Sequence, residues 1–203
     1  QFEPECRTDA FLAVKTNPPA HQLSDGAFRR GLRHVVTRNL AYDVYHYFHQ
    51  FDEVIDLARA MPDATIVCNH LGGYLGVGPY AGKRAEIYAK WREDITRLAA
   101  RPNVVMKLGG MAMRNAGLGV HAADHPMTSQ DYLEVNGDWF HHAIEQFGPD
   151  RCMFESNFPM DKVSISYTNL WNAFKKIAAQ YSEAERHALC HDTAARIYKI
   201  QTN

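Results

Sequence analysis

The 203-residue chain lacks several features that mark particular classes of protein. Lys and Arg total 22 and Asp and Glu 23, so the formal net charge of -1 gives no electrostatic footprint for nucleic acid or an anionic membrane. No apolar run reaches the roughly 18 residues that span a bilayer, and the N-terminus lacks a signal-peptide pattern. No GxGxxG or GxxxxGKS/T motif follows an expected strand, which argues against nucleotide binding. We therefore expect a soluble protein that acts on a small molecule.

The four cysteines are scattered and form no CxxC pair. Cys68 and Cys152 lie inside apolar, strand-like runs, while Cys6 and Cys190 lie elsewhere. This pattern predicts reduced thiols rather than disulfides and favours a cytoplasmic protein.

The composition, 46% hydrophobic and 22% charged, is ordinary for a globular chain, and we expect a single domain over residues 1–203. Residues 1–24 are expected to be an irregular lead-in. Because the chain opens at Gln1 without Met, we expect the numbering to begin inside a longer protein.

From about residue 25, short apolar runs alternate with patterns of helical spacing. The expected strands are 40–48, 64–68, 103–108 and 151–155, and the expected helices are 51–61, 83–100, 128–147, 164–180 and 182–198. This alternation predicts an α/β fold with a parallel sheet, either an open doubly wound sheet or half of an eight-stranded barrel. In both architectures ligands bind at the carboxyl ends of the strands.

Polar residues with catalytic potential follow two of these strands. His70 comes just before Leu71-Gly72-Gly73, where it could ligate a metal, transfer protons, or simply bond to a buried carbonyl. Glu155 and Asp161 follow the fourth strand and could act as general acid or base. The structural alternatives are that Asp161 caps the next helix and that Glu155 pairs with an arginine.

Two further residues interrupt strand-like runs. If the strand 40–48 continues, alternation places Tyr45, Tyr47 and His49 on one face and Phe48 on the other, so His49 is the expected cavity residue or, equally, a packed ring. Lys107 lies within an apolar strand and needs either an acidic partner or an anionic substrate.

Three stretches of the chain resemble a known family. They are Ile66 to Gly73 (IVCNHLGG), Asn103 to Gly110 (NVVMKLGG) and Arg151 to Pro159 (RCMFESNFP). These are similar to strands six, seven and eight of the amidohydrolase-2 group, TIM-barrel hydrolases related to pyrone-dicarboxylate lactonase and sugar lactonases. The resemblance covers about residues 16 to 200. It implies a (β/α)8 barrel of which this chain supplies roughly strands 5–8.

The family barrel carries metal-ligating histidines on strands one, five and six and an Asp on strand eight. The chain departs from this pattern at two of these places: Phe48 aligns with the strand-five His, with His49 one residue further on, and Asn157 replaces the Asp. Because a neutral Asn is a weak zinc ligand, the resemblance leaves open either one divalent ion, zinc or manganese, with His49 and His70 as the ligands, or a metal-free site.

The leading hypothesis is a lactonase-like hydrolase that cleaves a lactone or another C–O or C–N bond of a small, carboxylated substrate. His70 would polarise the carbonyl or move protons, Glu155 or Asp161 would act as base, and Asn157 would bind the oxyanion. The expected substrate-binding residues are Lys107 and Arg114 for a carboxylate and Tyr45, Tyr47, Tyr74 and Tyr80 for the pocket wall. The alternatives are a metal-dependent decarboxylase and a non-catalytic half barrel that covers its sheet edges as a homo-oligomer.

Overall fold

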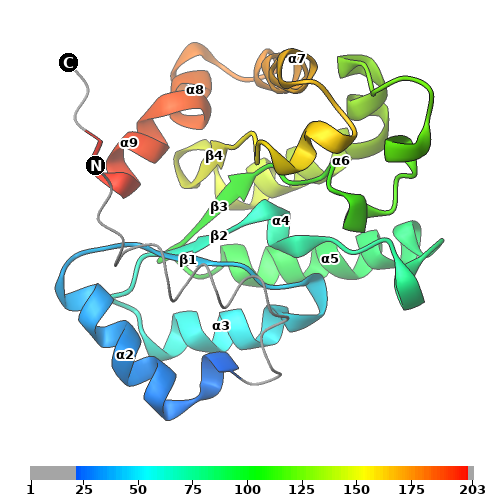
Figure 1. Ribbon diagram of the computed structural model, residues 1–203. Helices are drawn as coiled ribbons and strands as arrows, with labels where there is room; N and C mark the ends of the chain where they lie inside the picture. The colour runs from blue at the N-terminus through cyan, green and yellow to red at the C-terminus, as the bar shows by residue number, and fades with distance from the viewer. Residues whose placement is uncertain (1–21, 201–203) are drawn as a thin grey trace.

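A four-stranded parallel sheet forms the centre of the protein (Figure 1). The computed structural model describes residues 22–200, apart from the side chain of His121. The strands are β1 (Tyr42–Val44), β2 (Ile66–Cys68), β3 (Val104–Leu108) and β4 (Cys152–Phe154), and they pair in that order. Each pairing is parallel, which confirms the sheet type expected from the alternation of strands and helices.

Helices connect the strands and surround the sheet (Figure 1). The helices are α2 (Gly26–Thr37), α3 (Phe51–Ala60), α5 (Arg84–Ala99), α6 (Ser129–Phe147), α7 (Tyr167–Ala178), α8 (Glu183–His187), the π-helix η9 (Ala188–Asp192) and α9 (Thr193–Tyr198). Shorter turns are η2 (Gln22–Ser24), η3 (Phe48–Gln50), α4 (His70–Gly73), η4 (Gly78–Tyr80), η5 (Arg114–Ala116), η6 (Val120–Ala122), η7 (Pro149–Arg151) and η8 (Met160–Val163). Every helix in residues 22–200 is too short or too polar to span a lipid bilayer.

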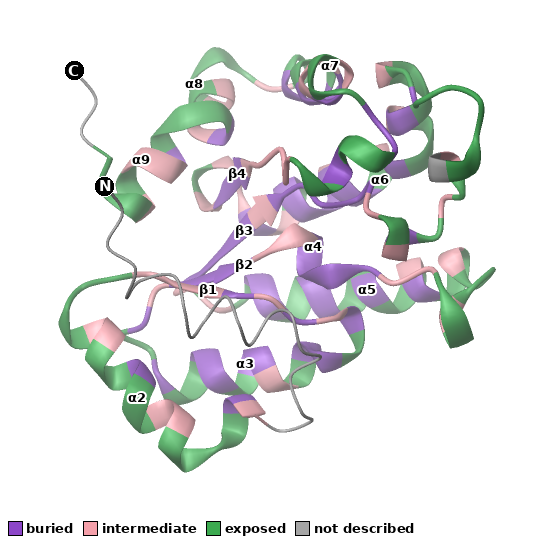
Figure 2. Ribbon diagram, viewed as in Figure 1, coloured by how far each residue is buried: buried purple, intermediate pink, exposed green. Residues whose placement is uncertain are grey.

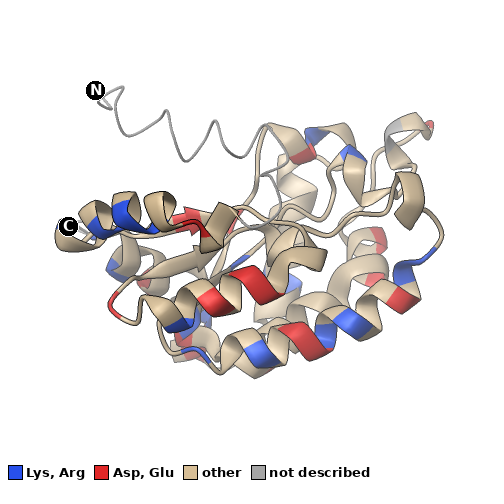
Figure 3. Cartoon of the chain, turned by 90° about the horizontal axis from the view of Figure 1, so that it is seen from below, with Lys and Arg blue, Asp and Glu red and all other residues tan. Residues whose placement is uncertain are grey.

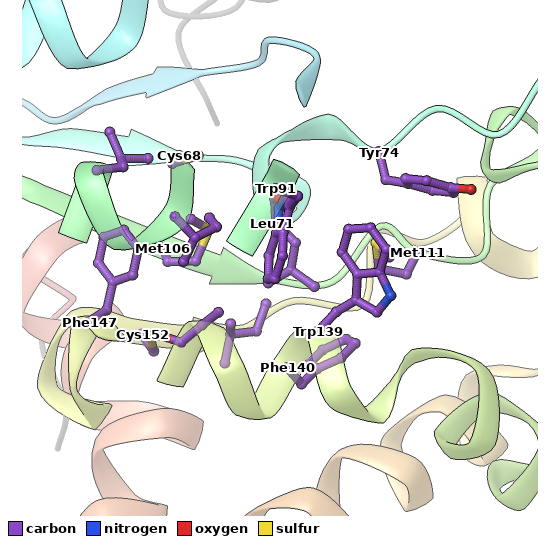
Figure 4. Close-up of a cluster of buried hydrophobic side chains, with 14 of the residues drawn as sticks. Cys68, Leu71, Tyr74, Trp91, Met106, Met111, Trp139, Phe140, Phe147 and Cys152 are labelled. Atoms are coloured by element: carbon purple, nitrogen blue, oxygen red, sulfur yellow. Dashed lines mark hydrogen bonds between the residues drawn. The ribbon is translucent and has the colours of Figure 1, made fainter. Parts of the chain in front are cut away.

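The two faces of the sheet differ because side chains alternate along each strand. One face is apolar and packs against the helices, with Cys68, Met106 and Cys152 fully buried (Figure 2). Figure 4 shows these three side chains together with Trp139 and Phe147 of α6. This layer is the hydrophobic core that the apolar runs of the sequence predict.

The opposite face, here called the inner face, comprises Asp43, Val67, Val105, Lys107 and Met153. The short helix α9 packs its apolar side against the two valines and Met153. The last helix therefore lies on the inner face, on the other side of the sheet from the core helices.

The beginning of the described chain differs most from expectation. The strand predicted over 40–48 stops at Val44, and Phe48–Gln50 form the 3-10 helix η3. Of the irregular lead-in predicted over 1–24, residues 1–21 lie outside the described part, while Gln22–Ser24 form η2. The unpredicted helix α2 follows, capped by Asp25, whose carboxylate accepts a hydrogen bond from the backbone N–H of Phe28 at 2.8 Å.

The cysteines within the described residues are free thiols, as expected. Cys68 and Cys152 are buried and Cys190 is exposed, while Cys6 lies outside the described residues. Burial raises the pKa of both buried thiols, so they are packed side chains rather than reactive thiolates.

Positions of Lys and Arg and positions of Asp and Glu both occur on the helices seen from below in Figure 3.

Candidate active site

His70 and Glu155 form a close pair at the carboxyl end of the sheet. His70 follows β2 and Glu155 follows β4, and Nδ1 of the imidazole lies 2.5 Å from Oε1 of the carboxylate. The same oxygen accepts a hydrogen bond from the backbone N–H of His70 at 3.2 Å. Because Glu155 engages Nδ1, the nitrogen left for chemistry on a substrate is Nε2. The side chains remain 16% and 17% exposed, so solvent can reach them.

Two glycines make this contact possible. Glu155 and His70 come from strands on either side of β3, and their side chains meet above Gly109 and Gly110, which follow β3. A Cβ atom at Gly109 would lie 2.5 Å from Cγ of Glu155, and one at Gly110 would lie 2.6 Å from Cγ of His70. The Leu108-Gly109-Gly110 sequence therefore leaves the space in which the pair forms.

The backbone at His70 is held in an unusual conformation. His70 and Leu71 have φ values of 55° and 51°, in the left-handed region that side chains other than Gly rarely adopt. The indole N–H of Trp91 donates a hydrogen bond to the carbonyl of Leu71 at 2.7 Å, and Gly73 passes so close to the carbonyl of His46 that a Cβ there would lie at 1.9 Å. Such conformations persist only where the surroundings enforce them, and they are frequent at functional sites.

Asp161 and Asn157 form a second polar pair next to the first. The amide nitrogen of Asn157 donates to Oδ1 of Asp161 at 2.7 Å, and the backbone N–H of Ala112 donates to Oδ2 at 3.2 Å. Asp161 is fully buried, and through the hydrogen bond from Ala112 it connects the loop after β4 to the loop after β3. Asn157 has a φ of 50°, so both pairs contain a residue in the left-handed region.

The two carboxylates differ in their electrostatic environment. Burial raises the pKa of Asp161 to about 6, although the bonds from Asn157 and Ala112 act in the opposite direction. Burial also acts to raise the pKa of Glu155, but the hydrogen bond and charge of His70, with the charge of Lys107, outweigh it and hold this pKa below its usual value. As the pH falls, Asp161 is therefore protonated before Glu155.

The aromatic residues predicted to wall the pocket separate into two groups. The Tyr45 ring meets the His70 ring edge-on, with centroids 5.1 Å apart, and Tyr47 packs against Tyr45 at 5.5 Å. Tyr74 is instead buried against Trp139, at 5.1 Å, within the helix layer. Tyr45 therefore lies beside the imidazole with Tyr47 packed against it, and Tyr74 lies in the core.

The two cationic residues predicted to bind a substrate carboxylate, Lys107 and Arg114, also lie in different environments. The Lys107 ammonium lies 2.5 Å from the Asp43 carboxylate on the inner face, so it has the acidic partner that its position in an apolar strand requires. Arg114 lies in η5, in the loop after β3, and is exposed.

His49 does not occupy the cavity position that alternation predicts. Since β1 ends at Val44, the two-residue period no longer applies at residue 49, and its exposed ring stacks between Tyr47 and Tyr80 at centroid distances of 6.0 and 5.9 Å. The histidine that turns inward is His46, which is buried beside Cys68. Burial, with the charge of His49, lowers the pKa of His46 to about 3, so it is neutral.

The described residues do not fit a metal centre on their own. Among residues 22–200, no three His, Cys, Asp or Glu side chains converge as metal ligands. Nδ1 of His70 is engaged by Glu155, and the His49 ring lies in a separate stack with two tyrosines. The two histidines that the sequence offers as ligands therefore do not form a shared donor set.

Sequence reasoning missed Asp43 and Tyr198, which share the environment of Lys107. The Tyr198 hydroxyl donates to both carboxylate oxygens of Asp43, at 2.9 and 3.0 Å. The sequence contained a signal for Asp43, because an acidic residue in one strand and Lys107 in another can form an ion pair across the sheet. Tyr198 had no such signal, because the path of the last helix depends on tertiary packing.

Known proteins resemble this chain in sequence and in fold. The family model described as Amidohydrolase matches residues 5–200. Uncharacterized protein y4mH of Sinorhizobium fredii is 39% identical over 176 residues, which are 85% of this chain and 52% of that protein. L-fucono-1,5-lactonase of Burkholderia multivorans is 29% identical over 214 residues, covering 96% of this chain and 66% of the lactonase. A crystal structure of a Burkholderia multivorans amidohydrolase with bound zinc matches with a TM-score of 0.73 and 28% identity, covering 89% of this chain and 60% of that one.

The chain thus spans between about half and two thirds of the length of these curated relatives. The region matched by the family model includes β1 to β4 and the residues that follow each strand. The expected family resemblance is confirmed, and the chain belongs to the amidohydrolase family.

Proposed function

We propose that this protein hydrolyses a lactone or a related C–O or C–N bond in a small molecule, with His70 and Glu155 as the central catalytic pair. The observation that carries the proposal is the 2.5 Å contact between them at the carboxyl end of the parallel sheet. Ligands of α/β folds bind at this end. The similarity to an L-fucono-1,5-lactonase supports the choice of a lactone as the first substrate class to test.

Glu155 orients the imidazole for general-base catalysis. With Nδ1–H bonded to the carboxylate, Nε2 carries the lone pair that takes a proton from water as the water oxygen attacks the carbonyl carbon. Glu155 then stabilises the imidazolium that forms, as a buried carboxylate does in other hydrolytic sites. When the tetrahedral intermediate collapses, the ring C–O bond breaks and the imidazolium returns its proton to the leaving oxygen.

Asn157 and Asp161 have different roles in this scheme. Asn157 uses one amide hydrogen to bond Asp161, and its second amide hydrogen is the donor that we assign to the developing oxyanion. Asp161 is fully buried, so we assign it the positioning of Asn157 and Ala112 rather than contact with substrate.

No step of this scheme passes through a metal, because the donor set in residues 22–200 does not form a metal site. A zinc or manganese ion in the protein would need ligands from outside these residues. Metal analysis of the purified protein by mass spectrometry measures this independently of activity.

We assign Arg114 to a carboxylate group of the substrate. Asp43 already neutralises Lys107, whereas Arg114 is exposed in the loop that follows β3. If this assignment is right, Arg114→Ala raises KM for carboxylated lactones and leaves KM for neutral sugar lactones unchanged.

The test measures the hydrolysis of a panel of neutral and carboxylated lactones. A pH indicator detects the acid that each hydrolysis releases. His70→Gln should lower kcat/KM by about 100-fold or more, since general-base catalysis contributes about that much. The matched control is His141→Gln, which removes an imidazole on α6, hydrogen-bonded to Tyr181. Full activity of His70→Gln would reject the proposed role of the pair. Release of carbon dioxide from a carboxylated substrate in place of acid would reject hydrolysis and favour the decarboxylase alternative.

We also propose that the four strands form half of an eight-stranded barrel. Among the described strands, β1 and β4 each have a neighbour on one side only, so each exposes an edge that proteins usually cover. Further strands of the same protein, or a second copy in a homo-oligomer, would complete the barrel. Light scattering of the intact protein, combined with its mass, separates these two arrangements.

A further inference from the structure

We propose that Asp43, Lys107 and Tyr198 form a positioning group that holds Glu155 against His70, and that helix α9 is thereby a working part of the site. The inference rests on the proposed function of the His70–Glu155 pair, because it concerns how that pair is kept in place.

The group is assembled from three separate parts of the chain on the inner face. Asp43 comes from β1, Lys107 from β3 and Tyr198 from the last residue of α9. The ammonium lies 2.5 Å from Oδ2 of Asp43, and the Tyr198 hydroxyl donates to both oxygens of the same carboxylate. The ammonium also lies 5.2 Å from the centre of the Tyr198 ring. Each member therefore contacts both of the others.

Lys107 lies between two carboxylates. Asp43 is on its β1 side, and Glu155 is on its β4 side, next to Gly109 on the same face. The backbone N–H of Glu155 donates to the carbonyl of Leu108 at 3.1 Å, which fixes Glu155 one step along the sheet from Lys107. The charge of Lys107 helps hold the pKa of Glu155 below its usual value. Because Lys107 pairs with Met153, Lys107 and Glu155 lie on the same face of paired strands, two residues apart in register, and from this position the ammonium acts on the carboxylate that orients His70.

The Tyr198 hydroxyl and the Lys107 ammonium both bind the Asp43 carboxylate. The lysine side chain is only 18% exposed, so its charge is weakly screened and needs a partner. By donating to Asp43, the tyrosine takes up part of that carboxylate's negative charge, which leaves more of the lysine's field for Glu155. The packing of Ala194 and Ile197 against Val67 and Met153 keeps the tyrosine in reach.

The packing of α9 on the inner face does not depend on the charged group, because the neighbouring inner-face residues under α9 are apolar. Lys107→Met leaves the Asp43 carboxylate without its cation, but this side chain is 32% exposed and keeps the hydrogen bonds from Tyr198, so the variant should fold with reduced stability. This separates a positioning role from a purely structural one.

The experiment compares Lys107→Met, Lys107→Arg and Tyr198→Phe in the intact protein. Lys107→Met should lower kcat at least tenfold with KM changed less than twofold, Tyr198→Phe should lower kcat by a smaller factor, and Lys107→Arg should restore kcat to within threefold of wild type. The matched control is Lys90→Met, which removes another 2.5 Å lysine–aspartate pair, between an exposed lysine and a buried aspartate within α5, and should leave kcat unchanged. Equal losses in Lys107→Met and Lys107→Arg, or an unchanged kcat in Lys107→Met, would overturn the proposal.

A second readout does not depend on activity. The His70 Nδ1–H proton in its short bond to Glu155 should give a downfield proton NMR signal that disappears in Glu155→Gln. If the positioning group works as proposed, Lys107→Met broadens or shifts this signal while the circular dichroism spectrum stays native. A wild-type protein that hydrolyses no lactone but shows this change refutes the proposed substrate and supports the positioning group. An unchanged signal in Lys107→Met refutes the positioning group alone.

Discussion

The substitution Gly109→Ala tests directly whether the meeting of Glu155 and His70 matters. A Cβ atom at this position would lie 2.2 Å from the backbone oxygen of Glu155 and 2.5 Å from its Cγ, whereas real Cβ contacts essentially never fall below 3.0 Å. Gly109 has no left-handed φ, so the added methyl introduces a contact and no intrinsic backbone strain. The end of β4 and the Glu155 side chain must therefore move away from β3.

The expected displacement is about 1 Å, and a misplacement of this size near a reacting group costs about 100-fold in rate. Overpacking of this kind lowers the free energy of unfolding by about 1–3 kcal/mol. We expect Gly109→Ala to remain folded by circular dichroism, with kcat/KM for a lactone reduced by about 100-fold. The downfield proton signal of His70 should disappear in the same variant.

The matched control is Gly137→Ala. Gly137 lies inside α6, and a Cβ there meets nothing within 4 Å. Alanine at such a position stabilises a helix by about 0.5–1 kcal/mol, so the variant should unfold at a higher temperature with unchanged kcat/KM. Wild-type kcat/KM in Gly109→Ala would refute the reasoning, because the pair would then work without its observed geometry.

Three further predictions concern the surroundings of the site. Because burial raises the pKa of Asp161 to about 6 from an ordinary 3.8, its contribution to stability is full below the unfolded pKa and is lost as pH rises through about 6. The free energy of unfolding of wild type relative to Asp161→Asn, measured by urea denaturation, should therefore fall by on the order of 3 kcal/mol between acidic and neutral pH, and a flat difference contradicts the assignment. Trp91→Phe removes the hydrogen bond to the Leu71 carbonyl and part of a buried ring, so thermal denaturation should show a loss of about 2 kcal/mol, and kcat should fall as the His70 turn loosens. His49→Ala should change stability by less than about 0.5 kcal/mol and leave kcat and metal content unchanged, since the ring is exposed; loss of a stoichiometric metal in this variant would show that His49 is a ligand.

Much of the fold follows from local sequence pattern. The apolar runs place β2, β3 and β4 within two residues of their observed bounds, and helical spacing locates α3, α5, α6 and α7. The first strand is the exception. Its aromatic residues have a high preference for strands, yet the chain turns after Val44, because Gly73 packs directly on the carbonyl of His46 and η3 begins at Phe48.

The sequence by itself determined that His70 and Glu155 each follow a strand of a parallel sheet, because strand ends are marked by local changes from apolar to polar and glycine residues. Only the tertiary structure decided that they touch, since they are 85 positions apart and meet over a glycine on the strand between them. The same holds for Lys107, whose need for a partner is visible in the sequence and whose partners, Asp43 and Tyr198, are not. Local pattern sets where a side chain leaves its strand, but the strand order and the path of the last helix set what it meets.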